Sequence, residues 1–327
     1  MYFQALIIDK VENEVLVQSR TLQWNDLPEG ELLIKVAYSS MNYKDALACS
    51  ANGNIVKSYP FVPGVDLAGI IVASGDDRFK EGDEVIVTGY GLGVTHYGGF
   101  SEYARLPAEW ALKLPKNLTL KEAMIIGTAG FTAALSVYEL VENGVGTADG
   151  PTLVTGATGG VGSMSVAILA KLGYEVVASS GKPEMIEHLL QLGASRVIMR
   201  SELIKDPIRA LDKQLWAGAI DCVGGQALAS LLPSIQYGGT VAISGMTGGA
   251  DLSTSVFPFI LRGIRLIGID SVQVKMSKRE KVWEKLASDF KPLLFENMAE
   301  EITLGQVMDY VPVILAGKSR GRIVVKL

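Results

Sequence analysis

The sequence feature that most constrains the fold is a glycine-rich turn at residues 156–162, set between a short apolar run and an apolar helical pattern. The run Leu153-Val154 precedes the turn, and apolar residues at helical spacing follow it as far as Gly173. This order predicts a strand, a phosphate-binding loop and a helix. Glycines let the backbone come close to a pyrophosphate, and the free amides at the start of the helix attract that anion. The segment therefore predicts the opening of a dinucleotide-binding unit.

The motif itself is Ala157-x-Gly159-x-x-Gly162, with alanine in the first glycine position of the usual fingerprint. On its own, this motif also fits a glycine-rich loop that binds no nucleotide. A second apolar run at residues 174–178 completes a β-α-β unit and favours nucleotide binding. We expect four loop residues to contact the cofactor: Thr158, Gly159, Gly160 and Val161.

The residues after the second strand indicate which cofactor is bound. A nucleotide without a ribose phosphate usually meets Asp or Glu there, whereas this chain has Ser179-Ser180-Gly181-Lys182. The third strand ends at Arg200, which emerges beside Lys182 in a sheet of order 3-2-1-4-5-6. Hydroxyls, an amide and cations suit a phosphate, so we predict NADPH bound by Ser180, Gly181, Lys182 and Arg200. The alternative is that the two cations are solvated surface residues.

Length and charge limit the class of protein. A chain of 327 residues can form two domains with substantial cores. A net charge of −5 without a dense Lys/Arg block argues against nucleic acid or an anionic membrane as the main partner. We find no run of about 18 apolar residues and no leader pattern. We therefore expect a cytoplasmic protein with a small-molecule substrate.

Cysteine and histidine are scarce. Cys49 and Cys222 provide no disulfide framework and no Cys-x-x-Cys pair. With only His96 and His188 besides, a zinc site built from His and Cys is hard to assemble. A Ser/His/Asp hydrolase is equally hard to assemble unless one of these two histidines serves.

The first 124 residues are β-rich, because short apolar or alternating runs are separated by glycine and proline turns. Such spacing is typical of a compact, partly closed barrel. The expected strands are Phe3 to Asp9, Val15 to Ser19, Glu31 to Ser40, Ala68 to Ser74, Glu84 to Thr88, Gly99 to Leu106 and Trp110 to Lys113.

The pattern then changes to alternating helices and strands. Residues 120–126 and 128–142 have helical spacing, and six strands of one doubly wound domain follow. These strands are Leu153 to Thr155, Glu175 to Ala178, Arg196 to Met199, Gly218 to Val223, Gly239 to Ser244 and Arg265 to Ile269. We therefore predict an α/β protein with a first domain at 1–124, a nucleotide-binding domain at 125–270 and a return to the first domain at 271–327.

Five motifs follow one another along the chain: residues 39–47 (SSMNYKDAL), 63–69 (PGVDLAG), 125–133 (IIGTAGFTA), 154–162 (VTGATGGVG) and Gly321-Arg322. By these motifs and their order, the chain resembles the medium-chain dehydrogenase/reductase superfamily, its zinc-independent quinone oxidoreductase branch and, within it, the YhdH/YhfP group that includes NADPH-dependent acrylyl-CoA reductases. The resemblance implies a GroES-like β-barrel-type catalytic domain plus a doubly wound Rossmann domain.

The same comparison argues against a metal. Zinc-using relatives have Cys-x-x-Asp where this chain has Asn42-Tyr43-Lys44-Asp45, and Gly-His-Glu where it has Gly64-Val65-Asp66. A thiolate and an imidazole are thus replaced by an amide and an isopropyl group, which are poor zinc ligands. We expect no metal site.

Without a Lewis acid, the reaction that fits is transfer of the nicotinamide hydride to the β-carbon of a conjugated C=C, with charge developing on the carbonyl oxygen. We expect Asn42 to orient the substrate or donate to that oxygen. Asp45 is expected to anchor the loop or to join a proton relay with Tyr43. By resemblance, Tyr43 lines the nicotinamide pocket. The alternative is that Asn42 and Asp45 cap a helix and that Tyr43 packs in the core.

Four further residues are candidate cofactor contacts. The resemblance places Thr128 near the nicotinamide. Met246 and Ser271 follow the fifth and sixth strands, at the carboxyl edge where ligands bind. Arg322 is expected to reach the pyrophosphate from the returning segment.

The sequence leaves three functions open. They are an NADPH-dependent reductase of an acrylyl-CoA-like enoyl thioester, an NADPH:quinone oxidoreductase, and a non-catalytic NADPH-binding structural or stress protein. We also expect a homodimer, because family members often pair sixth-strand edges and the apolar run 264–269 suits that role.

Overall fold

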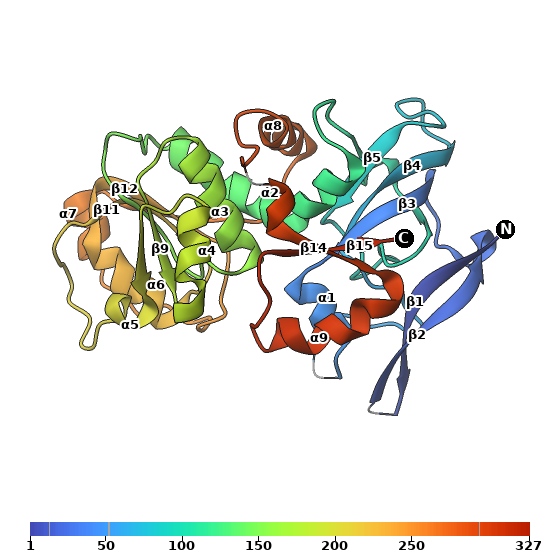
Figure 1. The fold of residues 1–327 in the computed structure, drawn as a ribbon, viewed down its shortest axis with the longest axis horizontal. Helices are drawn as coiled ribbons and strands as arrows, with labels where there is room; N and C mark the ends of the chain where they lie inside the picture. Colours follow the sequence, from blue (N-terminus) through green and yellow to red (C-terminus); the bar gives the residue numbers. More distant parts are fainter. Residues whose placement is uncertain (13, 52, 294) are drawn as a thin grey trace. The chain divides into compact units, whose positions relative to one another are not determined.

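The computed structural model describes residues 1–12, 14–51, 53–293 and 295–327 (Figure 1). The chain divides into two compact units. The first contains Met1–Thr128, Val272–Glu280 and Phe295–Leu327, and the second contains Ala129–Ser271 and Lys281–Leu294.

The first unit is built on a mixed sheet of order β14-β15-β3-β4-β5-β7, with β6 paired to β3. A separate antiparallel hairpin is formed by β1 and β2. Apolar side chains of β3, β4, β5 and β6 form one core, and α1 and α9 pack with β1 and β15 in another. The strands are β1 (Tyr2–Val11), β2 (Glu14–Gln23), β3 (Leu32–Met41), β4 (Asp66–Ser74), β5 (Glu84–Thr88), β6 (Tyr103–Leu106), β7 (Leu112–Lys113), β14 (Ala299–Thr303) and β15 (Arg322–Lys326), and the helices are α1 (Tyr43–Ala48) and α9 (Val307–Leu315).

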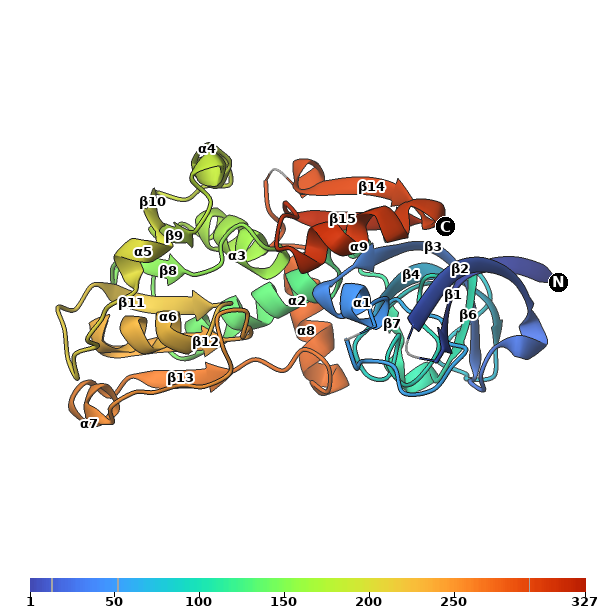
Figure 2. The same cartoon turned by 90° about the horizontal axis from the view of Figure 1, so that it is seen from below.

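The second unit contains a parallel six-stranded sheet of order β10-β9-β8-β11-β12-β13, which Figure 2 shows strand by strand. In chain order this is 3-2-1-4-5-6, so the predicted doubly wound fold is confirmed. Its strands are β8 (Thr152–Val154), β9 (Val176–Ser180), β10 (Arg196–Met199), β11 (Trp216–Asp221), β12 (Ile235–Ile243) and β13 (Arg265–Gly268). Its helices are α3 (Gly160–Lys171), α4 (Ile186–Gln191), α5 (Arg200–Leu203), α6 (Gly225–Leu231) and α7 (Phe257–Arg262).

One long helix, α2 (Leu120–Glu142), replaces the two helical segments expected from the sequence. The backbone leaves the helical region at Gly127, where φ is 50°, so the predicted break is present as a kink. The helix is long and apolar enough to cross a membrane, but 78% of its most apolar window is buried inside the protein. Burial of this kind is typical of a core helix.

The C-terminal segment differs from the predicted division, in which all residues from 271 onward return to the first domain. Helix α8 (Met276–Leu286) begins in the first unit, but residues 281–294 group with the second. The physical reason is the apolar face of this segment. The Trp283 ring stacks on Phe131 of α2 with centroids 5.9 Å apart, and Val282 and Leu286 are also buried.

Candidate active site

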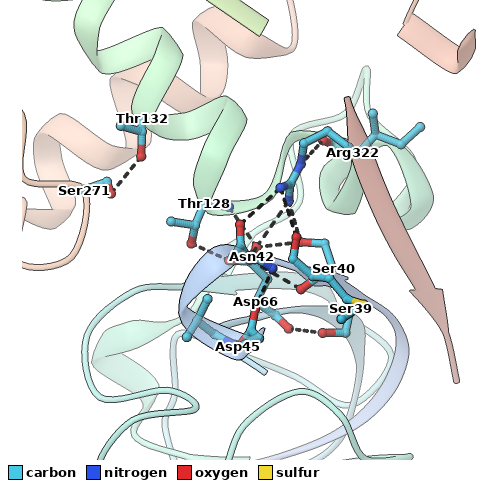
Figure 3. A network of polar contacts seen from close by, with 12 residues as sticks. Ser39, Ser40, Asn42, Asp45, Asp66, Thr128, Thr132, Ser271 and Arg322 are labelled. Carbon is cyan, nitrogen blue, oxygen red and sulfur yellow. Dashed lines mark hydrogen bonds and ion pairs between the residues drawn. The ribbon is translucent and has the colours of Figure 1, made fainter. Parts of the chain in front are cut away.

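A buried carboxylate, Asp66, is the centre of a polar network in the first unit (Figure 3). It opens β4 and is 0% exposed. Ser40 donates to it through Oγ at 2.6 Å and Asn42 through Nδ2 at 2.7 Å. Thr128 donates through its backbone N–H at 2.9 Å and also through Oγ1. A buried carboxylate requires such donors, because it has lost its hydration.

Arg322, at the start of β15, completes this network. Its guanidinium donates to Ser40 Oγ at 2.8 Å and to Asn42 Oδ1 at 3.2 Å, and lies 3.7 Å from Asp66 Oδ2. It also donates to the carbonyl oxygens of Met41 and Ile125. Burial lowers the pKa of Arg322, and the nearby carboxylates oppose that shift.

These contacts correct the prediction that Arg322 reaches the pyrophosphate. The side chain is only 3% exposed, and each guanidinium nitrogen donates to an acceptor of the first unit. Arg322 therefore belongs to the buried network, which we call the Asp66 hub: Ser40, Asn42, Asp66, Thr128 and Arg322.

Gly127 makes room for the Asp66 hub. A Cβ at this position would come within 2.6 Å of Asp66 Oδ2 and 2.5 Å of the Ser40 hydroxyl and the Arg322 guanidinium. The residue also has φ +50°, which favours glycine. The kink in α2 thus brings the Thr128 N–H to the carboxylate without filling the network.

Asn42 and Asp45 lie at the start of α1, and their contacts differ. The Asp45 carboxylate accepts the N–H of Asn42 at 2.8 Å and the N–H of Val65 at 2.9 Å. Burial raises the pKa of Asp45 to about 7, and Asp66 adds to that shift. Asp45 therefore has the loop-anchoring role, and both of its oxygens are committed to backbone donors. These contacts give no support to a proton relay with Tyr43.

Three residues form the accessible rim of the hub. Asn42 and Thr128 are half-buried, and Tyr43 is 51% exposed. The alternative is therefore half right: Asn42 and Asp45 form a capping box at the start of α1, but Tyr43 does not pack in the core. Its exposed phenol is free to reach a ligand, whereas the Asn42 amide is already oriented by Asp66 and Arg322.

The sequence reasoning missed Asp66 and Ser40 as site residues. A signal was present, because Asp66 is a lone carboxylate inside the apolar run Val65 to Ala68. Charged residues are almost never fully buried unless they are paired.

The glycine-rich loop of the second unit has the close approach expected of a phosphate site. Gly156 makes the turn with φ +58°, so the turn glycine lies one residue before Ala157, the residue that the sequence motif placed there. A Cβ on Gly162 would overlap the Gly156 carbonyl oxygen, which shows how tightly α3 packs on the loop. Gly159 is the N-cap of α3, and a Cβ there would meet only the Gly156 oxygen, at 3.5 Å. Thr158, Gly160 and Val161 flank this cap.

The ends of β9 and β10 bring the predicted phosphate residues together. Met199 pairs with Ser180, so Arg200 follows beside Gly181. A Cβ on Gly181 would lie 3.2 Å from the Arg200 guanidinium, and the Lys182 N–H donates to Ser180 Oγ at 2.9 Å. The Arg200 side chain is exposed, as a ligand contact requires.

The two residues predicted from the fifth and sixth strands have different surroundings. Met246 follows β12 and is 71% exposed. Ser271 is buried, and its Oγ accepts a hydrogen bond of 2.8 Å from Thr132 Oγ1 (Figure 3).

Sequence reasoning also missed a second buried carboxylate, at the end of β11. Asp221 accepts from Thr155 Oγ1 at 2.6 Å and from the Gly224 N–H at 2.7 Å. Burial raises its pKa, and these two donors oppose the shift. The contacts tie the end of β8 to the end of β11 at the edge where the glycine-rich loop begins.

Two family models match the chain. Residues 28–116 match the alcohol dehydrogenase GroES-like domain, and residues 160–288 match the zinc-binding dehydrogenase model. With the two units described above, these matches define a dehydrogenase/reductase with a GroES-like and a Rossmann-type domain.

Relatives narrow the class further. The chain is 53% identical to "Putative quinone oxidoreductase YhfP" of Bacillus subtilis, over 99% of both chains. A crystal structure of Bacillus subtilis YhfP with NAD bound superposes with a TM-score of 0.98 at 52% identity, with full coverage of both chains. It is 44% identical to the acrylyl-CoA reductase AcuI of Ruegeria pomeroyi, over 99% of this chain and 98% of that one. The YhdH oxidoreductase of Salmonella enterica in complex with NADP gives a TM-score of 0.97 at 45% identity, covering 99% of each chain. The chain belongs to the medium-chain dehydrogenase/reductase family, in its YhfP/AcuI group of oxidoreductases.

Proposed function

We propose that this chain is an NADPH-dependent reductase of a conjugated C=C, with an acrylyl-CoA-like enoyl thioester as its substrate and no metal in the reaction. The observation that carries the proposal is the Asn42 amide, which the Asp66 hub holds in one orientation at an accessible rim. The acrylyl-CoA reductase among the relatives supports this choice of substrate.

The second unit fits the proposed cofactor. In the Gly156–Gly162 turn an added Cβ would collide at Gly162 and meet only one atom at Gly159, and Arg200 lies over Gly181 next to Lys182. We assign the pyrophosphate to the loop residues 158–161 and the ribose phosphate to Ser180, Gly181, Lys182 and Arg200. When bound, NADPH supplies the hydride for the β-carbon of the enoyl group. The NADP complex of the Salmonella relative supports this assignment.

The residues of the Asp66 hub act on the substrate carbonyl. The Nδ2 group of Asn42 has one short bond, to Asp66, and one long contact of 3.4 Å to the Ser40 carbonyl oxygen. A substrate carbonyl oxygen can accept this second N–H of Asn42 in place of the Ser40 carbonyl oxygen, because it can form a hydrogen bond shorter than 3.4 Å. Arg322 and Asp66 fix the amide from both sides, so little reorganisation is required when negative charge develops on that oxygen. Tyr43 offers a second donor from the exposed side.

The absence of a metal is proposed on the chemistry of the donor set. The positions that hold thiolate and imidazole ligands in zinc-using relatives hold the amide of Asn42 and the isopropyl group of Val65. The Asn42 amide is bound to Asp66 and Arg322. Among the described ranges, no group of three His, Cys, Asp or Glu side chains is placed to hold a metal ion.

Two assays test the proposal. Purified protein is expected to oxidise NADPH faster with acrylyl-CoA than with a simple quinone, and a large preference for the quinone would favour the quinone oxidoreductase instead. Asn42→Ala is expected to lower kcat while the Kd for NADPH stays nearly unchanged, because the amide acts only on the substrate. Tight NADPH binding with no turnover of any activated alkene would identify a non-catalytic binding protein.

We also propose a cytoplasmic homodimer. Strand β13 is the last strand of the six-stranded sheet, and its edge is available for pairing across a two-fold axis. Light scattering is expected to give twice the chain mass for the wild type, and a monomeric wild type would contradict the dimer.

A further inference from the structure

The first unit has a cavity lined by none of the residues that were assigned a role above. Its volume is about 670 Å³, within the range of small-molecule sites. Two aromatic side chains line it, Tyr90 and Trp110, together with Met276 and two exposed charged residues, Glu109 and Lys275.

The backbone is bent to place Tyr90 at this cavity. Gly89 has φ +80° and Tyr90 has φ +52°. A left-handed conformation is costly for a bulky residue and persists only where the surroundings enforce it. Here the Tyr90 N–H donates to the Val272 carbonyl oxygen at 3.1 Å. Strain of this kind is typical of ligand sites.

The two rings belong to a fixed stack. Tyr90 and Trp110 are parallel, with an interplanar angle of 7° and centroids 5.8 Å apart. The buried guanidinium of Arg279 lies 4.7 Å from the Tyr90 centroid and donates to Thr88 Oγ1 at 2.8 Å. Gly91 lets the Trp110 ring approach, since a Cβ there would lie 2.9 Å from it. The aromatic wall is therefore preorganised.

The stack is connected to the Asp66 hub through one strand pair. Thr88, which accepts the Arg279 hydrogen bond, is the cross-strand partner of Asp66 in the β4–β5 register. Tyr90 follows Thr88 by two residues, so one wall of the cavity and the hub belong to neighbouring strands of the same unit.

We propose that this cavity binds the flat ring of an acidic nucleotide, namely the adenine portion of the coenzyme A carrier; this step rests on the proposed function. Tyr90 and Trp110 occupy each other by stacking, and as a pair they supply ring surface at the cavity against which the base packs. Lys275 is a cation for its phosphates, and Glu109 is an acceptor for its exocyclic amine. A quinone ring carries neither an anion nor an amine, and would leave both charged groups unused.

Binding is tested by calorimetry on the full chain saturated with NADPH, so that the Rossmann site is occupied, with adenosine 3′,5′-bisphosphate as the probe. The wild type is expected to bind it. Trp110→Leu and Tyr90→Asn are expected to raise Kd at least tenfold, and Lys275→Ala about threefold. Asn is chosen at position 90 because it tolerates left-handed backbone. Tyr237→Leu, at an exposed tyrosine of the second unit, is the control and is expected to leave Kd unchanged.

A substrate comparison separates this inference from the proposed function. The ratio of kcat/KM for acrylyl-CoA to that for acrylyl-pantetheine, which lacks the nucleotide, is expected to fall about tenfold in Trp110→Leu. If neither thioester is reduced, the proposed function fails, while the calorimetry still decides the cavity. The inference is overturned if the bisphosphate does not bind, if its Kd is the same in all variants, or if a naphthoquinone requires Tyr90 and Trp110 where the nucleotide does not.

Discussion

The Asp66 hub of the first unit and the glycine-rich edge of the second use polar groups in opposite ways. In the hub, charged and polar groups are buried and bind one another. At the edge, glycines at 156, 159 and 181 leave the backbone without side chains, and the cation Arg200 is exposed. The difference indicates two tasks. The hub fixes the position of a few atoms, and the edge leaves its contacts for a ligand.

The largest expected effect on stability is in the hub, at Arg322. Arg322→Leu is expected to reduce the free energy of unfolding by about 3–5 kcal/mol, because it leaves the buried Asp66 carboxylate without its cation. Urea denaturation measures the change. Arg78→Leu, which removes a surface arginine paired with Asp76, is the control and is expected to change stability little. A small loss at Arg322 would show that the hydroxyl and amide donors alone satisfy Asp66.

A second substitution tests the close packing at the edge. Gly162→Val places a side chain against the Gly156 carbonyl oxygen, so α3 must move away from the loop. The expected result is a loss of about 1–3 kcal/mol in unfolding free energy and a loss of detectable NADPH binding. Gly305→Ala, where a Cβ meets nothing within 4 Å, is the control. Unchanged NADPH affinity in Gly162→Val would show that the loop does not hold the pyrophosphate.

The edge could be predicted from the sequence far better than the hub. Its residues lie within one β-α-β unit and the next strand, and the strand order of a doubly wound sheet brings their ends together. The placement of Arg200 beside Gly181 follows from that rule. The turn glycine was misplaced by one residue, because the motif does not distinguish Gly156 from Ala157 as the residue with positive φ.

Asn42, Thr128 and Arg322 were site candidates, but their assembly around Asp66 could not be predicted, because the hub residues come from β3, β4, α2 and β15 and the segments beside them, and no local pattern joins them. Arg322 is separated from Asp66 by most of the chain, and an arginine near the C-terminus is expected at the surface. The division of α8 was missed for a similar reason. The stacking of Trp283 on Phe131 is a tertiary contact that helical spacing does not reveal.

The pH dependence of stability tests the protonation state of Asp45, the buried carboxyl at the start of α1. Its folded-state pKa, about 7, is raised above the ordinary value by burial, so the folded state prefers the neutral acid. The stability contributed by this group is fully present below about pH 4 and is lost as pH rises to about 7. Asn carries no charge at any pH, so the difference in unfolding free energy between Asp45→Asn and the wild type is expected to shift in favour of the variant as pH rises from about 4 to about 7.

Urea midpoints at several pH values measure this difference. Asp76→Asn is the control, since hydrogen bonds from Arg78 lower the pKa of Asp76 to about 2, outside that window. If Asp45→Asn shows the same pH dependence as the wild type, the two backbone N–H donors keep Asp45 ionised in the folded protein.

The smallest expected effect tests the open edge itself. Arg200→Ala is expected to raise the Kd for NADPH about tenfold and to leave the Kd for NADH nearly unchanged, because an exposed charge-assisted hydrogen bond contributes roughly 1.5 kcal/mol. Arg209→Ala, at an exposed arginine of the same unit, is the control. Calorimetry with both nucleotides measures the ratio. NADH is a meaningful comparison, because the Bacillus subtilis relative was crystallised with NAD bound. Equal losses of affinity for both nucleotides would mean that Arg200 does not contact the ribose phosphate and does not select NADPH.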